Sequence, residues 1–129
     1  MNILDENILE SQRQLLHKWR VPFRQIGIEV GRKGMKDEEI IPFLLTLPRL
    51  TFFSVDPDFC KRSLCHARYG LVFLDVAQEE AAIFARRVLR HPEFDAQAKR
   101  IGTVIRASHA GLVVWQLHGE REGRFDWTA

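Results

Sequence analysis

Short apolar segments alternate along this chain with longer segments whose apolar residues recur at helical spacing. Residues 1–4, 50–55 and 71–74 are runs of strand length made mostly of apolar and β-branched residues. Continuous runs of this kind are typical of strands that are buried on both faces of a parallel sheet. Residues 23–30 alternate between polar and apolar positions and predict a further strand. The run at residues 1–4 predicts a central strand.

The segments between these runs predict helices. Residues 8–18 and 79–89 carry apolar residues on one helical face, and residues 94–100 predict a shorter helix. Another helix is predicted to begin at Asp37, because negative charge in a first turn suits the helix dipole. Asn7 is placed to cap the first helix, since Asn accepts hydrogen bonds from the free N–H groups of a helix start.

The end of the chain differs from the rest. Residues 102–107 and 112–117 are β-rich runs around a short polar loop with glycine, which predicts an antiparallel hairpin. Strands that alternate with helices predict an α/β fold of three layers, α/β/α, with a central, mainly parallel sheet. The hairpin is predicted at its edge. We expect one domain over residues 1–118 and a fraying polar tail over residues 119–129.

Composition narrows the class of protein. The 129 residues fit one domain, and a net charge of +2 is not the strong basic signature of a nucleic-acid-binding protein. Arginines nevertheless gather in residues 86–106, where they either grip a polyanion or form solvated helix faces. No signal-peptide pattern and no membrane-length apolar run occurs. We therefore expect a cytoplasmic protein with Cys60 and Cys65 reduced.

Three of the predicted strands run directly into an aspartate. Asp5, Asp56 and Asp75 follow these strands, and Asp58 lies two residues beyond Asp56. In open α/β sheets, binding sites form beyond the carboxyl ends of the strands. The aspartates are therefore predicted at the same end of the domain. Taken singly, each could instead cap a helix or begin a turn, as Asp-Pro often does.

The helix predicted at Asp37 can bring Asp37 or Glu38 to the same end of the sheet. Several carboxylates packed together repel one another, and a divalent cation removes that conflict. Mg²⁺ and Mn²⁺ prefer such oxygen ligands. The pattern therefore predicts a Mg²⁺ or Mn²⁺ site, although Asp37 could serve only as a helix cap.

The motifs in this order resemble the short PIN-like proteins, which are relatives of the PIN-domain ribonuclease toxins of toxin–antitoxin systems. The resemblance covers nearly the whole chain. It is carried by Leu4-Asp5-Glu6-Asn7, by Gly34 with Asp37-Glu38-Glu39-Ile40, by Ser54-Val55-Asp56-Pro57-Asp58-Phe59, by Gly70-Leu71-Val72-Phe73-Leu74 and by the terminal hairpin.

The resemblance implies a Mg²⁺- or Mn²⁺-dependent endoribonuclease. By position, the catalytic and metal-binding acids would be Asp5, Asp37 or Glu38, Asp56 and Asp58. Asn7 and Ser54 would support these ligands. Ser54 stands where such proteins often have Thr, and Asp75 lies where they often lack an acid, so Asp75 is supported by topology alone.

The implied partners are an RNA substrate, an antitoxin protein and a second copy of the chain in a homodimer, with no membrane. The alternative is a non-catalytic PIN-like binding module for a protein or RNA. Its signature would be carboxylates that are paired with Arg or Lys and cannot meet around one ion. A phosphatase or a DNA nuclease using the same acidic site is a third hypothesis.

Overall fold

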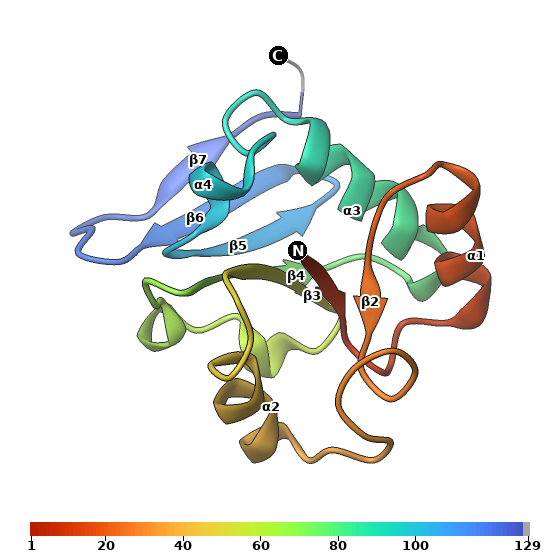
Figure 1. The fold of residues 1–129 in the computed structure, drawn as a ribbon. Coiled ribbons are helices and arrows are strands. Elements are labelled where there is room, and N and C mark those ends of the chain that lie inside the picture. Colours follow the sequence, from red (N-terminus) through yellow and green to blue (C-terminus); the bar gives the residue numbers. More distant parts are fainter. Residues whose placement is uncertain (128–129) are drawn as a thin grey trace.

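The computed structural model describes residues 1–127 and contains a seven-stranded sheet in the order β2-β1-β3-β4-β5-β6-β7 (Figure 1). Strands β2, β1, β3, β4 and β5 run parallel, and β6 and β7 join antiparallel. The predicted α/β class with a mainly parallel sheet is therefore confirmed. The strands are β1 (Asn2–Leu4), β2 (Arg24–Gln25), β3 (Leu50–Ser54), β4 (Tyr69–Leu74), β5 (Thr103–Ser108), β6 (Gly111–Gln116) and β7 (Gly123–Phe125).

Helices cover both faces of this sheet. Helices α1 and α3 pack against each other on one face, and α2 lies on the other (Figure 1). Within residues 1–127, no helix combines the length and apolar character that crossing a membrane requires. The helices are α1 (Glu10–Lys18), α2 (Asp37–Leu44), α3 (Ala81–Arg90) and α4 (Gln97–Arg100), and short 3₁₀ turns occupy Pro57–Phe59, Arg62–Leu64 and Gln78–Glu80.

Alternation along the strands divides the core into two halves. Phe53 and Val72 belong to the apolar cluster beneath α1 and α3, whereas Phe52 and Leu71 belong to the cluster beneath α2. Successive side chains of a strand point to opposite faces, so neighbouring residues supply opposite layers. This explains why β3 and β4 read as continuous apolar runs in the sequence.

Two predictions near the start of the chain were wrong. The strand predicted over residues 23–30 is only two residues long, because the chain turns back at Gly27, whose φ is +87°, and its N–H donates to the Val30 carbonyl. Glycine adopts this conformation without steric strain. Asn7 does not cap the first helix, which begins at Glu10 with Leu9 in the N-cap position.

The prediction of a fraying tail over residues 119–129 was also wrong for much of this segment. Gly123–Phe125 forms β7, which pairs with β6 and becomes the sheet edge beyond the hairpin. Trp127 packs against Phe84 and donates from Nε1 to the carbonyl of Ser108 at 2.6 Å. Apolar rings within a mostly polar segment hold it against the hairpin. Residues 128–129 of the predicted tail lie outside the described residues.

Candidate metal site

The strand order reverses direction between β1 and β3. The chain passes from β1 through α1 to β2 on one side, and then through α2 to β3 on the other side of β1. Such a reversal opens a crevice at the carboxyl ends of the two strands, where open α/β sheets bind ligands. Asp5 follows β1 directly, and Asp56 lies two residues beyond the end of β3. The topology thus places both residues at this crevice.

Three carboxylates converge at this end of the sheet. Asp37, Asp56 and Asp58 each offer an oxygen that lies within 4.8 Å of the others. Asp37 is the first residue of α2, while Asp56 precedes the 3₁₀ turn Pro57–Phe59. Oδ1 of Asp56 accepts the N–H of Asp58 at 2.9 Å, which fixes the turn that carries Asp58. Two separate segments therefore bring these acids together.

Asp5 lies behind this group and is connected to it through Ser54. The buried Ser54 hydroxyl donates to Oδ2 of Asp5 at 2.6 Å and accepts the N–H of Asp56 at 3.0 Å. Nε2 of Gln25 donates to the carbonyls of Asp5 and Ile8, which holds the chain where it leaves β1. Asp5 is only 8% exposed and is not one of the three residues whose oxygens meet.

Burial and the neighbouring negative charges favour the protonated form of Asp5 and Asp37, and a bound cation would oppose this effect. Burial raises the pKa of Asp5, and the nearby charges of Asp56 and Asp37 raise it further against the opposing hydrogen bond from Ser54. The pKa of Asp37 is also raised, first by desolvation and then by Asp56 and Asp58. Within residues 1–127, no ion pair involves Asp37, Asp56 or Asp58.

A hollow of about 410 Å³ adjoins the three carboxylates, and Asp37 and Asp58 form part of its wall. Glu38 lines the same hollow but does not join the group of three oxygens, so the geometry favours Asp37 as the ligand. Lys61, which was not predicted as a site residue, also lines it. Its position in the sequence, three residues after Asp58, could have predicted that it lies near the acidic residues.

Other predicted or neighbouring residues have partners elsewhere. Asp75 accepts two hydrogen bonds from the guanidinium of Arg106, at 2.9 and 2.7 Å, and is absent from the group of three. Asn7 is exposed, and its main-chain carbonyl accepts from Gln78. The Glu6 carboxylate accepts the N–H of Gly34, so it turns toward the loop before α2.

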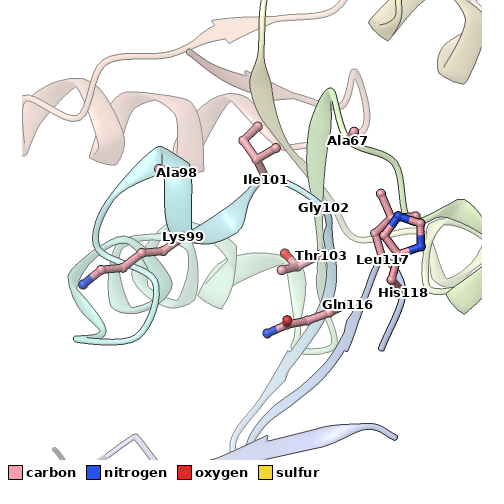
Figure 2. A pocket seen from close by; sticks show the side chains of 9 residues that line it. All are labelled: Ala67, Ala98, Lys99, Ile101, Gly102, Thr103, Gln116, Leu117 and His118. Carbon is pink, nitrogen blue, oxygen red and sulfur yellow. The ribbon is translucent and has the colours of Figure 1, made fainter. Parts of the chain in front are cut away.

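A second hollow, of about 360 Å³, lies at the start of β5 (Figure 2). Figure 2 shows Lys99 on one side of it, Leu117 and His118 on the other, and Thr103 with Gln116 between them. None of the described residues that line it is acidic. It lies at the amino end of β5 and is therefore separate from the carboxylate group at the carboxyl ends of the parallel strands.

Comparisons of the chain with protein-family models, with curated proteins and with solved structures found no match. The resemblance to PIN-like proteins therefore stays a prediction, and any assignment of function depends on the chemistry of the residues themselves.

Proposed function

We propose that this chain is a Mg²⁺- or Mn²⁺-dependent endoribonuclease of the PIN-like type, with its site at the carboxyl ends of β1 and β3. The observation that carries this proposal is the meeting of Asp37, Asp56 and Asp58 oxygens within 4.8 Å, with no ion pair to any of them in residues 1–127. The resemblance of the motifs to PIN-like proteins supports the choice of RNA.

The donor set fits a hard divalent cation. Carboxylate oxygens are the ligands that Mg²⁺ and Mn²⁺ prefer, and the mutual repulsion of three such groups is relieved by positive charge. When bound, the metal would lower the pKa of a water and stabilise negative charge on a phosphate. Asp37, Asp56 and Asp58 would hold it. Asp5, which is linked to the Asp56 main chain through the Ser54 hydroxyl, would add negative charge nearby.

The chain's own residues also suit a phosphodiester substrate. The adjoining hollow carries the Lys61 side chain on its wall, and an ammonium group there would bind a phosphate of the RNA backbone. Ser54 would hold Asp5 and the Asp56 main chain in fixed relation, so the ligands would keep their positions as substrate enters.

The lack of ion pairs to Asp37, Asp56 and Asp58 within residues 1–127 favours catalysis over the alternative of a non-catalytic binding module. Paired carboxylates were the signature expected of such a module, and the only strand-end aspartate with a cationic partner in the described residues is Asp75. Asp75 is therefore the natural matched control, because it lies at the end of the neighbouring strand and belongs to a separate ion pair.

The test compares Asp56→Asn with Asp75→Asn in RNA cleavage and in Mn²⁺ binding by calorimetry. We expect the wild type to cleave RNA with Mn²⁺ and to stop with EDTA. Asp56→Asn should lower the rate by at least about 100-fold, since even residues that only support a metal ligand cost 10–100-fold. Asp75→Asn should keep cleavage within about threefold of wild type, because it touches no ligand.

Mn²⁺ binding without cleavage of any RNA would overturn the nuclease and favour the binding module. Equal loss in Asp56→Asn and Asp75→Asn would show that the surface as a whole, and not the group of three carboxylates, supports activity.

A further inference from the structure

Arg100, the last residue of α4, is a buried cation without an anionic partner. Arg100 is only 5% exposed and forms no ion pair within residues 1–127. Nε donates to the Thr51 hydroxyl at 2.9 Å, and Nη1 donates to the Phe94 carbonyl at 2.6 Å. Arginine is almost never buried unless it is paired with a carboxylate or another anion.

The local fold holds Arg100 in this position. Gly70 of β4 approaches so closely that a Cβ there would lie 2.3 Å from the Arg100 carbonyl oxygen. The carboxylate of Asp95 raises the pKa of Arg100 but pairs with Lys99, at 2.8 Å. Burial has the larger effect and lowers the pKa of the guanidinium. The largely buried charge therefore has no carboxylate partner within residues 1–127.

Arg100 also lines a pocket. The pocket has a volume of about 320 Å³ and lies where β1 and β2 begin, at the opposite end of the sheet from the carboxylate group. Arg24 is a second arginine in the lining, and Asn2 and Gln97 also line the pocket. Among the described residues that line it, none is acidic. Nη2 of Arg100 donates to no protein atom within residues 1–127.

An anionic ligand would account for all of these observations. A guanidinium has five N–H donors, of which Arg100 uses two on neutral oxygens, so donors remain for an oxyanion. Arginine binds phosphate with paired, geometrically matched hydrogen bonds. The pocket volume is at the lower end of the range for small-molecule sites.

We propose that this pocket binds the phosphate group of a small ligand, held by Arg100 from inside and by Arg24 at the mouth. The site is independent of the proposed nuclease centre, because it lies at the other end of the sheet and uses none of the acidic residues. Inorganic phosphate and a nucleoside monophosphate share this chemistry and are separated by the experiment.

The experiment measures thermal unfolding of the full chain in EDTA, with sodium phosphate or 5′-AMP against sodium chloride of equal ionic strength. We expect phosphate to raise Tm by about 5 °C at a concentration roughly ten times its Kd. Arg100→Gln and Arg24→Gln should lose this increment. Arg121→Gln, which removes an exposed guanidinium before β7, should keep it. A larger increment with 5′-AMP would identify a phosphorylated nucleoside as the better ligand.

Arg24→Gln keeps the test decisive if Arg100→Gln fails to fold, because Arg24 is exposed and forms no ion pair in the described residues. The proposal is overturned if phosphate gives the wild type no more stability than chloride does. It is equally overturned if Arg24→Gln retains the full increment. Neither outcome depends on cleavage of RNA or on a bound metal.

Discussion

The hydroxyl of Ser54 connects the end of β1 to the end of β3, and its removal tests how the acidic group is held together. In Ser54→Ala, Oδ2 of Asp5 loses a donor at 2.6 Å, and the N–H of Asp56 loses an acceptor at 3.0 Å. Ser54 is fully buried, so water does not easily replace either partner.

The expected loss of stability follows from these two bonds. A hydrogen bond to a charged group contributes about 2 kcal/mol, and a bond between neutral groups about 1 kcal/mol. Ser54→Ala should therefore lower the free energy of unfolding by about 3 kcal/mol near neutral pH. With a urea m-value of about 2 kcal/mol/M, the unfolding midpoint falls by about 1.5 M. This is a large part of the stability of a small domain.

The effect should depend on pH in a defined direction. The Ser54 bond favours the charged form of Asp5, so its removal raises the pKa of a carboxyl that burial has already raised above 3.8. The loss of stability should be greatest where Asp5 is ionised. It should shrink toward about 2 kcal/mol as pH falls below the folded pKa of Asp5, because both lost bonds are then bonds between neutral groups.

Urea unfolding followed by tryptophan fluorescence, at about pH 7.5 and at about pH 3, below the ordinary pKa of an Asp carboxyl, in EDTA, measures this difference. Ser108→Ala is the matched control, because within residues 1–127 its hydroxyl forms a single hydrogen bond, accepting the N–H of Ala110 at 3.3 Å in the hairpin turn. It should cost less than about 1 kcal/mol at both values of pH. A loss below about 1 kcal/mol for Ser54→Ala at pH 7.5, or a loss that grows toward acid pH, would show that Ser54 does not hold Asp5 and Asp56 together in this way.

Three further predictions concern stability. Asp5→Asn in EDTA should be more stable than wild type at pH 7. The raised pKa of Asp5 gives the wild type stability that is present below pH 3.8 and is lost as pH rises through the folded pKa, so the two urea midpoints should converge in acid. Gly70→Ala should cost about 3 kcal/mol in urea unfolding, since its Cβ would lie 2.3 Å from the main-chain oxygen of Arg100; an unchanged midpoint would mean that α4 shifts freely. Trp127→Ala should cost about 2 kcal/mol in the same assay through lost packing and the lost bond to the Ser108 carbonyl, whereas a fraying tail would show no change.

Much of the acidic group could be predicted from sequence because it depends on strand ends. Asp5 and Asp56 follow strands whose apolar runs are evident in the sequence, and parallel strands share one carboxyl end. The choice between Asp37 and Glu38 could not be made this way. It depends on the rotation of α2 about its axis, and packing against the sheet decides that rotation.

The ion pair of Asp75 could not be predicted from the sequence. By its position after β4 it is equivalent to Asp5, but the register of β4 with β5 places Arg106 beside Phe73 and within reach of the Asp75 carboxylate. A pairing between residues 31 positions apart is set by strand register, which no local pattern of the sequence reveals.

The secondary-structure elements follow from the sequence, since hydrophobic periodicity is a local property that β3, β4, α3 and the terminal hairpin display clearly. Which elements become neighbours depends on the packing of the folded chain. It placed β3 beside β1, so that a crevice forms where Asp56 and Asp58 meet Asp37. It also buried Arg100 away from any carboxylate partner among the described residues. These outcomes depend on strand order and register, which the long-range packing of the whole chain determines.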